Sequence, residues 1–176
     1  MQENLTITIA TKEDVPQLEK LVNAAYRGES SKKGWTTEAD LLDGIRTNKD
    51  VLSGMINRGD SIVLKCINAT GELVGCVYLQ NKEEKLYLGM LTVEPDIQDQ
   101  GIGKKLLQAA EEYASTQQCS AITITVISLR QELIKWYERR GYKATGEKKP
   151  FPSNDPRFGL PKQDLEFIVM EKELND

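Results

Sequence analysis

Histidine is absent from this chain of 176 residues, and its absence narrows the chemistry that the protein can perform. Without an imidazole, the chain cannot form a Ser–His or Cys–His nucleophilic pair. It also lacks the side chain that most often binds metal ions, so we expect no metal cofactor. Any proton transfer must then use Tyr, Glu, Asp, Lys or Cys side chains, or water.

Cysteine is scarce as well, and no apolar run is long enough to cross a membrane. Cys66, Cys76 and Cys119 show no spacing typical of a metal site or a disulfide framework. The first residues do not resemble a secretory signal peptide. An odd number of cysteines without such a signal favours free thiols in a reducing compartment, so we expect a cytoplasmic protein.

The net charge and the length of the chain narrow the possible binding partners and the number of domains. The formal net charge is −4, whereas a protein that binds nucleic acid nonspecifically is usually basic. We therefore expect neither a nucleic-acid partner nor a membrane partner, and the sequence leaves a homodimer open. The length predicts a single domain over residues 1–176, large enough to bury a hydrophobic core.

The most informative pattern is a glycine-bearing turn at residues 98–104, Gln-Asp-Gln-Gly-Ile-Gly-Lys. Residues 86–93 before it have the character of a strand, which ends at Glu94-Pro95. After it, apolar side chains recur on one face of a helix, at Ile102, Leu106, Ala110, Tyr113 and Ala114. The turn therefore precedes a helix N-terminus, where unpaired N–H groups and the helix dipole favour an anion such as phosphate.

Two familiar nucleotide motifs do not fit this turn. A dinucleotide-binding turn would have a third glycine at position 106, which is leucine. A P-loop would have Ser or Thr after Gly103-Lys104, and this chain has Lys105. A purely structural turn, with Asp99 as the helix cap, is the remaining alternative.

The pattern Gln98-x-x-Gly101-x-Gly103 resembles motif A of the GNAT superfamily of acyl-CoA-dependent N-acetyltransferases. Residues 133–142, Leu-Ile-Lys-Trp-Tyr-Glu-Arg-Arg-Gly-Tyr, resemble a later helix and turn of that family. The resemblance covers about the whole chain. It implies an α/β fold with a twisted mixed sheet of about seven strands, flanked by helices. Two central strands would splay apart at Val93–Pro95 to admit the cofactor, and Gly89 is a candidate for a nearby β-bulge.

The resemblance implies transfer of an acetyl group from acetyl-CoA to a primary amine by direct attack in a ternary complex. The amine would belong to a small molecule or a protein. Arg130 departs from the family, because many members have Asn seven residues before the tyrosine that corresponds to Tyr137. The cofactor contacts implied are Leu91, Thr92, Val93, Gln98, Asp99, Gln100, Gly101, Ile102, Gly103, Lys104, Arg130, Ile134 and Tyr137.

The resemblance places the hydroxyl of Tyr137 near the sulfur of CoA, as the general acid for the leaving thiolate. A tyrosine that only packs the core is the alternative, because Tyr137 shares helical spacing with Leu133. For the general base we single out Glu94, with Glu83, Glu84 and water as alternatives.

The acceptor is expected between two polar loops at residues 27–36 and 148–163. Trp35 and Phe151 could form apolar walls there, and Glu29 could hold a cationic acceptor. A non-catalytic acyl-CoA sensor on the same fold is a second hypothesis, and a plain interaction module with a structural turn is a third.

Local patterns predict the remaining elements. The four prolines between Pro150 and Pro161 predict a loop over 148–163. Strands are expected at 5–10, 61–68, 72–80, 85–93, 120–127, 142–147 and 165–170. Helices are expected just after Thr11, over 37–45, over 49–57, from 102 onward and over 130–140.

Overall fold

The computed structural model describes residues 5–26, 42–43, 47–95, 101–150, 160–161 and 165–174. Its helices are η1 (Lys12–Asp14), α1 (Val15–Tyr26), α2 (Lys49–Asn57), α3 (Ile102–Thr116) and α4 (Gln131–Glu138). Its strands are β1 (Thr6–Ile9), β2 (Leu42–Asp43), β3 (Ser61–Ile67), β4 (Leu73–Lys82), β5 (Lys85–Val93), β6 (Ala121–Ile127), β7 (Lys143–Pro150), β8 (Leu160–Pro161) and β9 (Glu166–Glu173). No helix in these ranges is long and apolar enough to cross a membrane.

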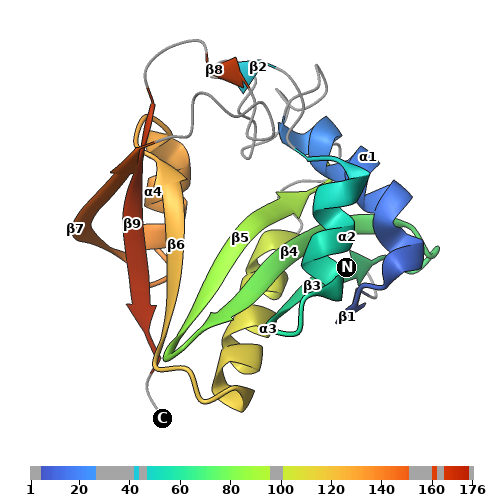
Figure 1. Ribbon diagram of the computed structural model, residues 1–176, viewed down its shortest axis with the longest axis horizontal. Helices are drawn as coiled ribbons and strands as arrows, with labels where there is room; N and C mark the ends of the chain where they lie inside the picture. The colour runs from blue at the N-terminus through green and yellow to red at the C-terminus, as the bar shows by residue number, and fades with distance from the viewer. Residues whose placement is uncertain are drawn as a thin grey trace.

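Seven of the strands form one twisted sheet in the order β1-β3-β4-β5-β6-β9-β7 (Figure 1). The neighbouring strands are antiparallel except at the centre, where β5 and β6 run parallel. Helices α1 and α2 cover one face of the sheet, and α3 lies behind it (Figure 1). This arrangement confirms the predicted mixed α/β sheet of about seven strands.

The two central strands diverge earlier than the sequence analysis predicted. β5 and β6 pair only over Lys85–Tyr87 and Ala121–Thr123, and beyond these residues they separate (Figure 1). The divergence therefore begins after Tyr87 rather than at Val93–Pro95. Each strand keeps its other neighbour, because β5 stays paired with β4 and β6 with β9. The backbone hydrogen bonds of those outer pairs keep each half of the sheet intact, and the short pairing of β5 with β6 joins the two halves.

A β-bulge interrupts β5 inside the gap. Gly89 pairs with Tyr78 and Thr92 pairs with Cys76, so Met90 and Leu91 together face one residue of β4. Met90 has a φ of 55°, a left-handed conformation that is unusual for a side chain of this size. The hydroxyl of Thr92 donates a hydrogen bond of 2.8 Å to the carbonyl of Met90, which supports the bulge. The left-handed residue is therefore Met90, next to the predicted position Gly89.

The bulge changes the face of the sheet on which the side chains of β5 lie. Before it, Leu86 and Leu88 belong to the core cluster beneath α3. Met90 belongs to the cluster beneath α1 and α2. After it, Leu91 and Val93 return to the α3 side, so the even-numbered pattern becomes an odd-numbered one. One extra residue shifts the two-residue alternation of a strand in this way.

Two sequence predictions about loops and helices are wrong. Leu42 and Asp43, expected in a short helix, form β2 and pair with Pro161 and Leu160 of β8. This pairing joins distant parts of the chain, so a local helical pattern cannot reveal it. β7 also extends to Pro150 within the expected loop, because the outermost strand of a sheet tolerates a residue without an N–H. The other residues of both segments lie outside the described ranges.

The remaining strands and helices are confirmed, and local chemistry explains how several of them begin or end. Thr11 precedes η1, and its backbone N–H donates a hydrogen bond of 2.8 Å to the Asp14 carboxylate. Asn48 caps α2 by accepting a hydrogen bond of 2.9 Å from the N–H of Val51. In the turn between β3 and β4, Gly71 adopts a φ of 85°, a conformation that favours glycine.

Candidate active site

A cavity of about 240 Å³ lies in the gap between β5 and β6. Its lining combines residues from both core clusters, so the cavity reaches both faces of the sheet. The diverging strands contribute Leu88, Gly89, Met90 and Leu91 on one side and Ile124, Thr125, Val126 and Ile127 on the other. The remaining lining residues are Tyr26, Met55, Tyr78, Tyr87, Arg130, Leu133, Tyr137 and Phe167.

Tyr137 lies at this cavity on α4 and is only 5% exposed. Its ring packs edge-on against Trp136 and Tyr142, with centroid distances of 5.1 and 5.5 Å. Within the described residues its hydroxyl makes no hydrogen bond. Burial raises the pKa of Tyr137 well above its ordinary value, and Arg130 opposes this effect. The phenol therefore carries its proton at neutral pH and can donate it to a bound group.

Arg130 and Ile134 begin the same helix. Arg130 is the N-cap of α4 and lines the cavity. The N–H of Ile134 donates to the carbonyl of Arg130 at 3.0 Å, and its half-buried side chain packs against the core beneath α3. Both residues were predicted as cofactor contacts. Arg130 is among the described residues that line the cavity, and Ile134 is not.

Along β5, the backbone N–H and C=O groups of successive residues point alternately toward β4 and toward the gap. The N–H of Glu94 donates to the carbonyl of Val74 at 2.9 Å, so the polar groups of Glu94 and Thr92 face β4. By alternation, the backbone groups of Leu91 and Val93 face the side from which β6 has diverged. The Glu94 side chain lies beyond the end of β5, and it is not among the described residues that line the cavity.

The glycine turn leads directly into α3. Gly101 is the N-cap with a φ of 79°, so Asp99 is not the cap residue. The N–H of Lys105 makes the first helical bond, 2.9 Å from the carbonyl of Gly101. The N–H groups of Ile102, Gly103 and Lys104 therefore have no partner within the helix. Gln98, Asp99 and Gln100 lie outside the described residues.

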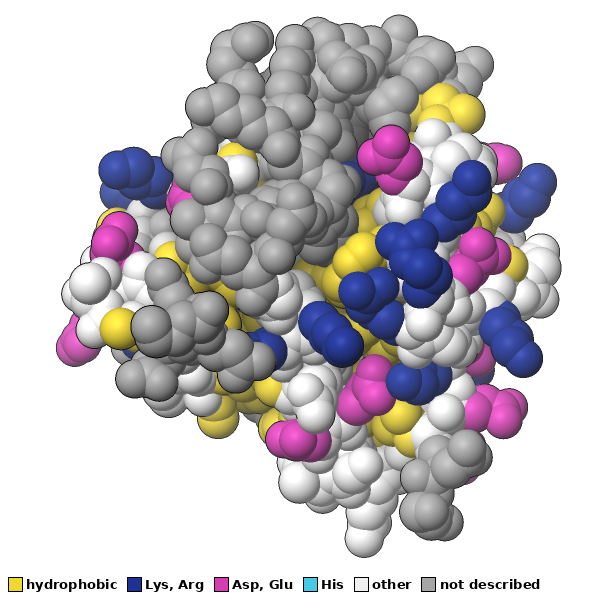
Figure 2. Space-filling model, turned by 180° about the vertical axis from the view of Figure 1, so that it is seen from behind, with side chains coloured by type: hydrophobic (Ala, Val, Ile, Leu, Met, Phe, Trp, Pro, Cys, Tyr) yellow, Lys and Arg dark blue, Asp and Glu magenta, His cyan; other side chains and the backbone are white. Residues whose placement is uncertain are grey.

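The charge at this end of α3 suits an anion. Lys104 is exposed and Lys105 is half-buried in the first helical turn, where a cation gains nothing from the helix dipole. Figure 2 shows Lys and Arg side chains gathered on the face of the molecule that carries α3. Gly103 is buried within the helix, whereas Gly101 is exposed at its start.

Comparison with known proteins identifies the fold family. Residues 37–152 match the family model described as an acetyltransferase (GNAT) domain. The chain belongs to the GNAT acetyltransferase family. The chain is also 27% identical over 94 residues to the uncharacterized protein YdhI of Bacillus subtilis, and this match covers 52% of the chain and only 56% of that relative.

Two solved structures resemble this chain over nearly their whole length. The ribosomal-protein-S18-alanine N-acetyltransferase of Escherichia coli aligns with a TM-score of 0.71 at 14% identity, covering 98% of this chain and 96% of the other. The PaiA N-acetyltransferase of Thermoplasma acidophilum, solved with coenzyme A, aligns with a TM-score of 0.69 at 20% identity, covering 97% and 99%. At these identities the likeness shows the fold alone.

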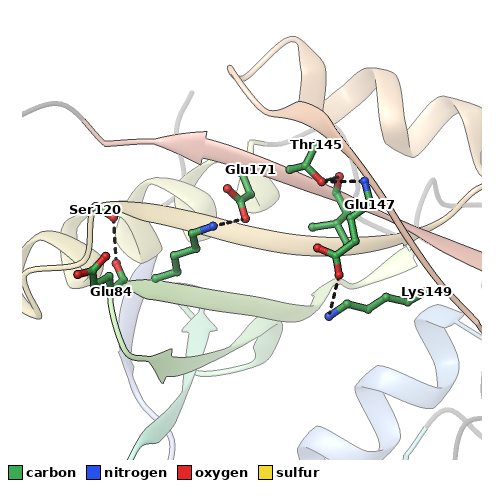
Figure 3. A network of polar contacts seen from close by, with 8 residues as sticks. Glu84, Ser120, Thr145, Glu147, Lys149 and Glu171 are labelled. Atoms are coloured by element: carbon green, nitrogen blue, oxygen red, sulfur yellow. Dashed lines mark hydrogen bonds and ion pairs between the residues drawn. The ribbon is translucent and has the colours of Figure 1, made fainter.

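Several residues considered as bases or as acceptor contacts do not lie at the cavity or lie outside the described residues. Glu83 and Glu84 form the turn between β4 and β5, at the closed end of the strand pair. The Glu84 carbonyl accepts hydrogen bonds from the N–H and hydroxyl of Ser120, at 2.7 and 3.2 Å (Figure 3). Both carboxylates are thus withdrawn as bases. Glu29, Trp35 and Phe151 lie outside the described residues.

The sequence analysis missed several residues that line the cavity, namely Tyr26, Met55, Tyr78, Tyr87 and Phe167. For Tyr26 a signal exists, because it follows Val22 by four residues and continues the apolar face of α1. For Tyr78 and Tyr87 the signal is weaker. Aromatic residues are common in strands, and only the divergence of β5 and β6 brings these two to a cavity.

Proposed function

We propose that this acetyltransferase transfers an acetyl group from acetyl-CoA to a primary amine, of a small molecule or a protein, by direct attack in a ternary complex. The observation that carries this proposal is that Tyr137, Arg130 and the gap-facing edge of β5 meet at one cavity. The coenzyme A bound to the similar Thermoplasma protein supports the choice of donor.

The cofactor would lie across two elements. The pantetheine arm would pair with the edge Leu91–Val93 as an added strand, and the thioester oxygen would accept a hydrogen bond from the N–H of Val93. The pyrophosphate would bind the N–H groups of residues 101–104, with residues 98–100 completing the turn. Both contacts use backbone groups, so they place few demands on side chains.

Tyr137 and Arg130 would act on the leaving group. When the amine attacks, the thioester bond breaks and the sulfur takes up negative charge, to which the Tyr137 phenol donates its proton. Arg130 lowers the pKa of Tyr137 against the effect of burial, so it makes this donation easier. Its positive charge would also stabilise the developing thiolate.

The acceptor amine needs a group that takes up its proton and residues that bind it. It must lose a proton before or during attack, and we assign this step to Glu94 or to water that leads to solvent. Glu29 would hold the charge of a cationic acceptor, and Trp35 and Phe151 would form its walls.

A turnover screen tests this proposal. The protein is mixed with acetyl-CoA and a panel of amines, peptides and polyamines, and the release of free thiol is measured. Acetyl-CoA at 100 times its dissociation constant should stabilise the fold by about 2.7 kcal/mol. This corresponds to a rise in Tm of roughly 5–10 °C for a domain of this size.

The two readouts distinguish the alternatives. If acetyl-CoA at millimolar concentration leaves Tm unchanged, the proposed donor is wrong. Stabilisation without thiol release for any amine in the panel would favour the sensor hypothesis over the enzyme.

A further inference from the structure

Tyr87 occupies a special position at the closed end of the gap. It is the last residue of β5 that pairs with β6, opposite Thr123. Immediately beyond it the two strands diverge around the cavity, and Tyr87 is one of the lining residues. Its half-buried side chain therefore stands at the inner end of the space where the strands part.

The ring of Tyr87 extends forward into the gap. A Cβ atom built on Gly89 would lie 2.9 Å from ring atom Cε2 of Tyr87, so the ring lies directly over this glycine. The Tyr87 hydroxyl reaches across to β6, where it lies 3.4 Å from Oγ1 of Thr125. The side chain thus spans the beginning of the gap from one strand to the other.

A neighbouring ring holds Tyr87 in this orientation. Tyr78, on β4, packs edge-on against it with a centroid distance of 6.3 Å. The ammonium group of Lys82 lies 5.0 Å from the centroid of the Tyr87 ring. Gly89 has a steric role here, since any larger residue at that position would displace the ring.

The same cavity connects Tyr87 with Tyr137. The lining of this cavity also includes the apolar side chains of Leu88, Ile124 and Val126. A group attached to a sulfur beside the Tyr137 hydroxyl would share this space, and an alkyl chain matches its apolar lining. Such a chain would grow toward the end that Tyr87 closes.

We propose that Tyr87 determines acyl-chain specificity by limiting the donor to short-chain acyl-CoA thioesters. This inference rests on the proposed function, since it concerns the acyl group of the same donor. Removing the ring would lengthen the apolar end of the cavity. Each further methylene buried there would tighten binding about fourfold, from about 0.8 kcal/mol per methylene.

The experiment measures binding, so it needs no known acceptor. The full chain is titrated calorimetrically with CoA, acetyl-CoA, butyryl-CoA and hexanoyl-CoA, as wild type, Tyr87→Ala and Tyr87→Phe. We expect wild type and Tyr87→Phe to bind hexanoyl-CoA at least tenfold more weakly than acetyl-CoA. Tyr87→Ala should bind hexanoyl-CoA at least tenfold more tightly than wild type does, with free CoA unchanged within threefold.

A second variant replaces Tyr87→Ala in the experiment if that protein does not fold. If circular dichroism shows that Tyr87→Ala does not fold, Tyr87→Leu keeps an apolar side chain and still removes the ring from the gap. An identical chain-length profile in wild type and the folded ring-deleted variant would overturn the role of Tyr87 while leaving the donor assignment intact. Wild-type protein that binds hexanoyl-CoA as tightly as acetyl-CoA would overturn it too. Failure of the wild type to bind any of the four ligands would contradict the proposed function itself.

Discussion

The hydroxyl group of Tyr26 donates a hydrogen bond to the backbone carbonyl of Leu91, and this contact joins the end of α1 to the bulge of β5. Both residues are buried, and both line the cavity. The bond therefore ties a helix on one face of the sheet to the strand edge along which we propose that the donor binds.

Replacing Tyr26 by Phe tests how much this contact contributes. The variant leaves the Leu91 carbonyl without its partner, so we expect the free energy of unfolding to fall by about 1–2 kcal/mol. We also expect a lower kcat/KM for acetyl-CoA, because the bulge is less firmly positioned. Urea denaturation and steady-state kinetics measure the two effects.

Tyr113→Phe is the matched control. Tyr113 is half-buried on α3 and is not among the described residues that line the cavity. Its substitution should change stability by less than about 0.5 kcal/mol and leave kcat/KM unchanged. Equal stability of Tyr26→Phe and wild type would show that the Leu91 contact contributes nothing.

Tyr137→Phe tests the proposed general acid. The change keeps the ring packing against Trp136 and Tyr142 and removes only the hydroxyl. We expect kcat to fall by about 10²–10⁴-fold, the range for general acid catalysis, with little change in the KM for acetyl-CoA. Stability should not fall, because within the described residues this hydroxyl makes no hydrogen bond that could be lost.

The pH dependence adds a second test of Tyr137. Burial raises the pKa of Tyr137 well above its ordinary value, so the phenol stays protonated as the pH increases. Wild-type kcat should therefore show no loss of activity from ionisation of Tyr137 up to about pH 9–10. Unchanged kcat in Tyr137→Phe would remove the residue from the mechanism and leave water as the proton source.

The sequence predicted those parts of the fold and site that depend on local patterns. Helix α3 follows from apolar residues spaced three and four apart, and the glycine turn before it follows from Gly101. The residues lining the gap could not be predicted in the same way. Gly89 indicated a bulge in this part of β5, but the register shift against β4 that makes Met90 the left-handed residue depends on strand pairing, which no residue type in β5 specifies.

The wrong choices share a physical cause. Glu83 and Glu84 are close in sequence to the site strand, but a strand of nine residues places its two ends far apart. Leu42 fits a helical pattern, yet its pairing with Pro161 depends on a segment more than a hundred residues later. Tyr26 reaches the cavity because of how α1 packs on the sheet, and sequence spacing shows only that it is buried.

Gly101→Ala tests whether the turn before α3 binds phosphate. Gly101 has a φ of 79°, and a Cβ there would meet no described atom within 4 Å. The substitution should therefore cost about 1 kcal/mol in backbone strain without a clash. If the pyrophosphate lies against this turn, the added methyl group should also weaken CoA binding at least tenfold. Calorimetric titration with CoA measures this effect.

The turn between β3 and β4 supplies a control with the same geometry. Gly71 has a φ of 85° and equally open space around a built Cβ. Gly71→Ala should lower stability by a similar amount and leave CoA affinity unchanged. If both variants bind CoA like wild type, the phosphates lie elsewhere.

Asp14 should make the stability of the fold depend on pH. Burial raises the pKa of its carboxyl, but hydrogen bonds from the Thr11 backbone and the Lys65 ammonium group outweigh this effect and keep the pKa below its ordinary value of 3.8. The Lys65 Nζ lies 2.9 Å from the carboxylate, and both side chains are largely buried. This contact links β3 to the start of α1.

The direction of the pH effect follows from that lowered pKa. A carboxyl whose pKa is lower in the folded state stabilises the protein above its unfolded pKa, and this contribution is lost as the pH falls through the folded pKa. We expect Asp14→Asn to lower the free energy of unfolding by about 1–2 kcal/mol at pH 7. The difference between the two proteins should be similar at pH 7 and pH 5 and smaller at pH 3, because it is lost as the pH falls through the lowered pKa of Asp14. Urea midpoints at pH 7, 5 and 3 measure this, with the exposed neighbour Glu13→Gln as control, and a constant difference across the range would contradict it.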